Sequence, residues 1–137
     1  MNGYLLDTAV LTAYLRGRAG AVTLVSPWIA QQLASTSIIV YGECIERTRS
    51  FADPGRWQTD LRQLLQAIHP FDLNYAILER YADLRRLLRP TGNLIGDMDT
   101  LIAATAIEHD LTLVTIDSDF KRIAGLTLDL LQRSALV

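Results

Sequence analysis

The stretch from residue 93 to residue 120 places the strongest constraint on how this chain can fold. Its middle part, LIAATAIEHD, combines apolar residues at helical spacing with small alanines that allow close packing, which predicts a buried helix. The residues that follow, LTLVT, are apolar and partly β-branched, which indicates a short buried strand. One carboxylate pair, Asp97 and Asp99, opens the helix, and a second, Asp117 and Asp119, follows the strand.

The same alternation of short apolar segments and helices runs through the rest of the chain. The segment Gly3-Tyr4-Leu5-Leu6-Asp7-Thr8 predicts a short apolar strand that ends in Asp7 and leads into a helix. A second strand over residues 35–40 runs into a helix that carries Glu43 in its first turn. Open parallel α/β sheets hold their ligands at the carboxyl ends of the strands, so we expect these acids at one edge of one sheet.

The remaining segments extend this pattern. A Ser-Pro start predicts a short helix over residues 28–33. Amphipathic spacing predicts longer helices over residues 57–68 and 75–88, the last of them capped by Asp72. An apolar run over residues 126–131 predicts a final strand at the edge of the sheet. We therefore expect a layered α/β fold with a parallel sheet.

Length and charge bound the possible functions. The 137 residues, half of them hydrophobic, suffice for one domain with one complete core over residues 1–137. A net charge of −2 gives no global basic field of the kind that announces a nucleic-acid-binding protein. All the basic residues except Lys121 are arginines, however, and arginine binds phosphate in a bidentate way, so local phosphate-binding patches stay possible.

Cysteine usage and hydropathy indicate the compartment. Cys44 is the only cysteine, so no intramolecular disulfide or thiolate metal site can form, and a reducing compartment is expected. The sequence shows no secretory signal pattern and no uncharged stretch near the roughly 20 residues that span a bilayer. We expect a cytoplasmic protein with no membrane partner.

One acid from each of four places could form a metal site: Asp7, Glu43, Asp99 and Asp117. Four carboxylates within a few ångströms raise each other's pKa, and they stay ionised only around a cation. Oxygen ligands without His or Cys suit Mg²⁺ or Mn²⁺, which can activate a water against a phosphodiester. The alternative is that Asp7 only caps the following helix and Glu43 only complements a helix dipole.

These motifs resemble the PIN-domain ribonucleases, and most closely the toxins of bacterial VapBC toxin–antitoxin pairs. The resemblance covers essentially the whole chain and rests on LLDT, SIIVYGE, DTLIAATAIEHDLTLVT and TIDSDF, of which the third is the most specific. It implies a three-layer αβα sandwich with a central, mainly parallel sheet, and Mg²⁺- or Mn²⁺-dependent endonucleolytic cleavage of RNA. It also implies a homodimer held inactive by a cognate antitoxin whose C-terminal segment enters the active-site groove.

The resemblance also assigns site residues. It places the family's acidic tetrad on Asp7, Glu43, Asp99 and Asp117, with Asp119 as an auxiliary acid and Thr8 and Thr115 as polar neighbours of the metal. The segment TIDSDF is shorter than the usual family motif, which leaves Asp117 and Asp119 as rival ligands, and we favour Asp117. Asp97 and Asp99 point about 200° apart on a helix, so one of them faces the metal. We favour Asp99, with Asp97 as the N-cap.

Other classes of protein fit less well. A receiver domain would need a lysine late in the chain after a strand, but Lys121 follows Asp119 with no strand between them. A haloacid-dehalogenase-type phosphatase would need Asp-x-Asp after the first strand, where this chain has Asp7-Thr8-Ala9. A non-catalytic α/β binding module, or another Mg²⁺-dependent phosphoryl-transfer domain, remains the alternative. Large apolar residues in 28–33 and 57–68 outnumber what one sheet needs, which indicates a subunit interface.

Overall fold

Five parallel strands form the central sheet in the computed structural model, which describes residues 2–137. The strands are β1 (Tyr4–Leu6), β2 (Ala34–Ser37), β3 (His69–Phe71), β4 (Thr112–Thr115) and β5 (Leu128–Leu130). Their order is β3-β2-β1-β4-β5, so the first strand lies at the centre and the last at an edge. The predictions of a parallel sheet and of a final edge strand are confirmed, although β5 is shorter than expected.

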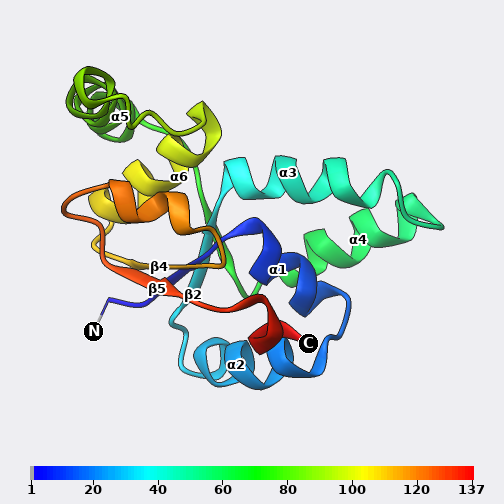
Figure 1. Cartoon of the computed structure of the whole chain (residues 1–137). Coiled ribbons are helices and arrows are strands. Elements are labelled where there is room, and N and C mark those ends of the chain that lie inside the picture. The colour runs from blue at the N-terminus through cyan, green and yellow to red at the C-terminus, as the bar shows by residue number, and fades with distance from the viewer. Residues whose placement is uncertain (1) are drawn as a thin grey trace.

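Helices cover both faces of this sheet, which makes the fold the predicted three-layer αβα sandwich (Figure 1). The α-helices are α1 (Thr8–Leu15), α2 (Ala19–Ala30), α3 (Ile38–Thr48), α4 (Pro54–Leu64), α5 (Tyr75–Leu88) and α6 (Asp97–Glu108). Three short 3₁₀ segments are η1 (Arg89–Thr91), η2 (Ser118–Arg122) and η3 (Arg133–Leu136). In Figure 1, α6 lies above β4 and α2 lies below it, while α5 packs on the outer side of α6.

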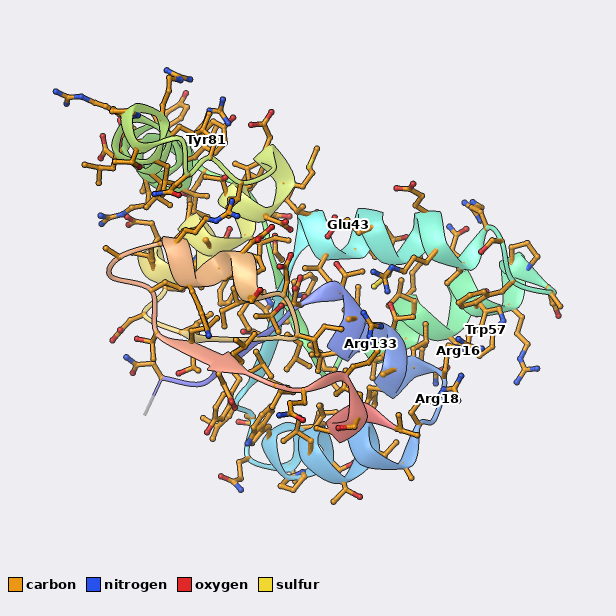
Figure 2. All side chains as sticks on the ribbon, viewed as in Figure 1. Arg16, Arg18, Glu43, Trp57, Tyr81 and Arg133 are labelled. Atoms are coloured by element: carbon orange, nitrogen blue, oxygen red, sulfur yellow. The ribbon has the colours of Figure 1, made fainter. Side chains whose placement is uncertain are left out.

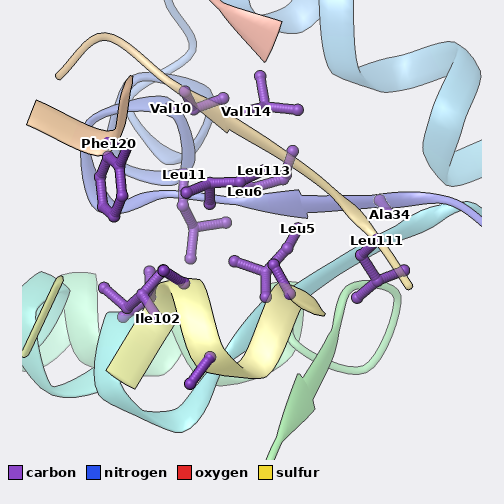
Figure 3. Close-up of a cluster of buried hydrophobic side chains, with 14 of the residues drawn as sticks. Leu5, Leu6, Val10, Leu11, Ala34, Ile102, Leu111, Leu113, Val114 and Phe120 are labelled. Carbon is purple, nitrogen blue, oxygen red and sulfur yellow. The ribbon is translucent and has the colours of Figure 1, made fainter. Parts of the chain in front are cut away.

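The hydrophobic core lies on both sides of the central strands (Figure 3). Leu5 and Leu6 of β1 are fully buried and, because side chains alternate along a strand, they point to opposite faces. Ile102 of α6 and Phe120 of η2 are buried in the same core. A strand that is buried on both faces is held firmly, so its carboxyl end provides a well-fixed position for the next residue, Asp7.

The helix before β2 differs from the prediction. The expected helix over residues 28–33 is wrong, because α2 begins at Ala19 and contains Pro27. Proline removes one backbone hydrogen bond from a helix interior. Ala21 and Val25 are fully buried, and tertiary packing of such a face supplies most of a helix's stability. That packing outweighs the single lost bond near the end of the helix.

The second strand ends earlier than its β-branched residues indicate. The expected strand over residues 35–40 is wrong beyond Ser37, because residues 38–40 form the first turn of α3. Ser37 ends the strand by capping this helix, since its Oγ accepts a hydrogen bond from the Ile39 backbone N–H at 3.1 Å. Glu43 consequently lies in the second turn of α3 and not in the first.

Two predicted helix caps are also wrong, because neighbouring groups compete for the same positions. Asn74, and not Asp72, caps α5, and its Oδ1 accepts from the Ile77 N–H at 2.9 Å. Gly96 occupies the N-cap position of α6, so Asp97 is the first helical residue. The Asp97 carboxylate is held across the helix pair by Tyr81 and Arg85 of α5.

The apolar residues that indicated a subunit interface pack largely within the chain itself. Trp28 stacks on Tyr4 with ring centroids 3.8 Å apart, and Leu61 and Ile68 are fully buried. Within residues 2–137 the exposed large hydrophobic residues lie elsewhere, at Ile38, Tyr75, Leu78, Leu87, Met98 and Val137. Dimerisation therefore stays a prediction. No helix in this part of the chain is long and apolar enough to cross a membrane.

Candidate metal and active site

Four carboxylates from four elements line one cavity of about 480 Å³ at the carboxyl edge of the sheet. Asp7 follows β1, and Asp117 follows the neighbouring strand β4. Glu43, labelled in Figure 2, reaches the cavity from α3, and Asp99 reaches it from the first turn of α6. The fold thus brings the four predicted acids to one place, because the ends of β1 and β4 and the N-terminal halves of α3 and α6 meet at this edge.

Asp7 is a helix cap, but capping uses only one of its two oxygens. Its Oδ1 accepts from the Thr8 backbone N–H at 2.8 Å, as the capping alternative requires. Its Oδ2 accepts from the Thr115 hydroxyl at 2.6 Å. The carboxyl group is buried, and this burial raises the pKa of Asp7, although the bonds from Thr115 and Thr8 act in the opposite direction.

Threonine hydroxyls orient the other acids of the cavity. The Thr8 hydroxyl donates to Glu43 Oε1 at 2.6 Å, which joins α1 to α3. The Thr115 hydroxyl, which donates to Asp7, accepts from the Asp117 backbone N–H at 3.1 Å. Thr8 and Thr115 are both buried, so the predicted polar neighbours form a network that fixes the carboxylates.

Asp99 is the acid of the cavity whose negative charge has no hydrogen-bond donor or cation beside it in the described residues. Its side chain has no hydrogen bond or ion pair with any described residue in 2–137, and it is half-buried. Desolvation by burial, followed by repulsion from Asp7, Glu43 and Asp117, raises the pKa of Asp99 to about 6. A carboxyl group in this environment would be stabilised in its charged form by a bound cation.

The other acid of each pair, Asp97 beside Asp99 and Asp119 beside Asp117, does not line the cavity. Asp119 donates its backbone N–H to Asp117 Oδ1 at 2.9 Å, and its own carboxylate lies 3.4 Å from the Arg122 guanidinium. Asp97 is engaged by Arg85 of α5. The geometry therefore separates Asp99 from Asp97, and Asp117 from Asp119, in the sense that the sequence favoured.

Sequence reasoning missed two arginines. Arg47 and Arg133 line the same cavity as the acids, yet neither forms an ion pair with a carboxylate of residues 2–137. Arg47 lies one turn after Glu43 on α3, so helical periodicity could have found it. Arg133 comes from η3 at the far end of the chain, and no local signal in the sequence points to it.

The chemistry of the donors fits a hard cation. Only oxygen ligands line the cavity, since His69 and His109 pack against Phe71, with ring centroids 4.6 and 3.9 Å away. Cys44 is buried, and this burial raises the pKa of its thiol to about 11. In the described residues no three Asp, Glu, His or Cys side chains converge tightly enough to hold an ion by direct contact alone. Mg²⁺ typically keeps several waters, which suits such a spacing.

Comparison with known proteins identifies relatives. The model of the PIN-domain family matches residues 4–126. A VapC ribonuclease, Y4jK, from Sinorhizobium fredii is 38% identical over 66 residues, which are 48% of this chain and 46% of that protein. The chain is thus matched to only about half the length of this curated relative.

Solved structures extend the similarity to nearly the whole fold. The structure of VapBC2 from Rickettsia felis bound to a promoter DNA fragment contains a chain with a TM-score of 0.83 and 26% identity, covering 94% of this chain and 98% of that one. DNA-bound VapBC from Salmonella typhimurium gives 0.81 at 20% identity, with 94% and 98% covered. VapBC-1 from nontypeable Haemophilus influenzae gives 0.79 at 23% identity, with 93% and 96% covered. The last two support the fold alone.

Proposed function

The chain belongs to the PIN-domain family, and from this premise we propose that it is a metal-dependent endoribonuclease, the toxin of a type II toxin–antitoxin pair. The observation that carries the proposal is the state of Asp99, a half-buried carboxylate with a raised pKa, four acidic neighbours and no hydrogen-bond or ion-pair partner in residues 2–137. A structural acid would be capped or paired. An acid kept in this state is suited to a cation.

The tetrad Asp7, Glu43, Asp99 and Asp117 would hold Mg²⁺ or Mn²⁺, with Asp119 as an auxiliary acid. When bound, such an ion lowers the pKa of water and stabilises negative charge on a phosphodiester. Oxygen donors favour these two ions over zinc. The spacing of the acids favours an ion that is held through a few carboxylates, retained waters and the substrate phosphate.

The protein's own residues would prepare this site for the substrate. The hydroxyls of Thr8 and Thr115 hold the carboxylates of Glu43 and Asp7 in one orientation, so little reorganisation is needed when the substrate arrives. Arg47 and Arg133 place positive charge on the cavity wall, where a phosphate oxygen can accept hydrogen bonds. No histidine of residues 2–137 lines the cavity, so imidazole is not the general base.

Relatives supply the biological setting of the proposal. The Sinorhizobium relative is named a ribonuclease, and the Rickettsia structure is a VapBC complex at 26% identity. We infer that this chain, as one domain over residues 1–137, cleaves RNA in the cytoplasm, forms a homodimer and is inhibited by a cognate antitoxin protein.

The proposal is tested by cleavage of a panel of structured RNAs with purified protein and Mg²⁺ or Mn²⁺. We expect Asp7→Asn and Asp99→Asn each to abolish cleavage while the melting temperature stays the same or rises, because each removes like-charge repulsion. Asp83→Asn is the matched control, since Asp83 is exposed on α5 and has no partner in residues 2–137. Cleavage that persists unchanged in both tetrad variants would leave the non-catalytic binding module as the better explanation.

A further inference from the structure

A second cavity, of about 190 Å³, opens beside the acidic one and is lined by arginines. Ala9, Ile116 and the two arginines of the acidic cavity, Arg47 and Arg133, line both, so the two cavities adjoin. Arg16 and Arg18, from the junction of α1 and α2, complete the second one. Figure 2 shows Arg133, Arg16 and Arg18 along this side of the molecule, below the α3 helix that carries Glu43. We call these four residues, Arg16, Arg18, Arg47 and Arg133, the arginine track.

The described residues provide no ion-pair partner for any of the four arginines, although Arg47 and Arg133 also line the acidic cavity. No Asp or Glu of residues 2–137 lines the second cavity. Other arginines in the chain are paired with carboxylates, namely Arg56, Arg80, Arg85 and Arg122. Four like charges around one small cavity repel one another. A bound anion would remove this cost.

Arg16 is held in place for such a ligand. Its guanidinium lies over the Phe51 ring, 4.7 Å from the centroid. A stacked guanidinium keeps the N–H groups at its edge free to donate hydrogen bonds. The stacking also restricts the arginine side chain before the ligand binds, so binding costs less conformational entropy. Ala13, Ile116 and Leu136 provide apolar walls beside the four arginines, whose own side chains are exposed to solvent and therefore accessible to an anionic ligand.

We propose that the arginine track binds the backbone phosphates that flank the scissile phosphodiester of an RNA strand. The inference rests on the proposed function, because it takes the acidic cavity as the place of cleavage. A phosphodiester strand matches this arrangement of charges, since one phosphate can face the cation held by the acids while neighbouring phosphates face the adjoining arginines. An acidic peptide matches less well, because its carboxylates would enter next to four acids of the same charge.

Binding is measured in an Asp99→Asn background, which keeps the probe intact, by fluorescence anisotropy of a fluorescein-labelled oligouridylate at several salt concentrations. Arg16→Gln/Arg18→Gln should raise the Kd about tenfold and lower the slope of log Kd against log salt by about 1 to 2, since two phosphate contacts are lost. The control is Arg86→Gln/Arg89→Gln, which removes the same charge from exposed, unpaired positions elsewhere. Equal slopes in the two double variants would overturn the inference.

Catalysis separates this inference from the proposed function. Bis(p-nitrophenyl) phosphate has one phosphodiester and no flanking phosphates, so the Arg16/Arg18 double variant should lose more activity on oligouridylate than on this compound. Absence of metal-dependent hydrolysis of both substrates by the unmodified chain would refute the proposed function, while the salt slopes would still decide the inference. A competition experiment with oligoglutamate tests the alternative ligand. If oligoglutamate displaces the oligouridylate at equal charge concentration, the arginine track binds acidic peptides, and the assignment to RNA is overturned.

Discussion

Replacing Asp99 by asparagine should stabilise the metal-free protein at neutral pH. In the folded chain the pKa of Asp99 lies at about 6 against an ordinary value of 3.8, a difference equivalent to about 3 kcal/mol for a fully shielded group. Asp99 is only half-buried, so solvent screening reduces the expected gain to about 1–2 kcal/mol. Asparagine has nearly the same shape, and no hydrogen bond to residues 2–137 is lost.

The stability advantage of Asp99→Asn should depend on pH in a defined direction. Because the pKa is higher in the folded than in the unfolded chain, the folded protein binds the proton more tightly. The stability of the unmodified protein therefore falls as the pH rises from about 4 to about 6, and the penalty is complete above that range. The advantage of Asp99→Asn should be near zero at about pH 4 and reach its full value above about pH 7.

The assay is urea unfolding in EDTA, followed by tryptophan fluorescence. Trp28 stacks on Tyr4 and Trp57 packs edge-on against Phe51, so both indoles report on folded structure. Saturating Mg²⁺ should stabilise the unmodified chain more than the variant. An advantage that is constant across pH, or a variant that is less stable at neutral pH, would refute the account of Asp99 as an uncompensated charge.

Four further outcomes follow from the same structure. Gly20→Ala should lower the unfolding free energy by about 1–3 kcal/mol in urea titrations, because its Cβ would lie 2.3 Å from the Ala135 carbonyl oxygen. Gly42→Ala, a helical position with open space, should raise it by about 0.5–1 kcal/mol. Thr115→Val should raise the pKa of Asp7 further and weaken Mn²⁺ binding up to about tenfold in calorimetry, most strongly at low pH. EDTA should abolish phosphodiester hydrolysis, and Mn²⁺ should restore it.

Much of the fold could be predicted from the sequence because local patterns and tertiary packing agree there. The alanine-rich run became α6, and the apolar segments after Gly3 and Asp110 became the central strands β1 and β4. Predictions failed where two local signals compete. Ser37 ended a β-branched strand by capping a helix, and Pro27, a strong start signal, lies inside α2 because that helix buries its apolar face.

The acids of the candidate site could be predicted from the sequence because each follows a predicted strand or opens a predicted helix, and these positions meet at the ligand-binding edge of a parallel sheet. Their distances could not be known, nor could the choice of Asp99 over Asp97 be more than a preference. The structure places the two acids differently, since Arg85 and Tyr81 of α5 engage Asp97 while Asp99 lines the cavity, and the role of Asp99 in metal binding stays a prediction.

By itself, then, the sequence determined the alternation of strands and helices that brings the predicted site acids to one edge of a parallel sheet. Only the tertiary structure decided that arginines from the α1–α2 junction, α3 and η3 would meet beside those acids. Gly20 allows this meeting, because its missing Cβ lets the last residues lie against α2, where its N–H donates to the Val137 carbonyl at 2.9 Å. Contacts between such distant segments depend on shape complementarity, which leaves no local pattern in the sequence.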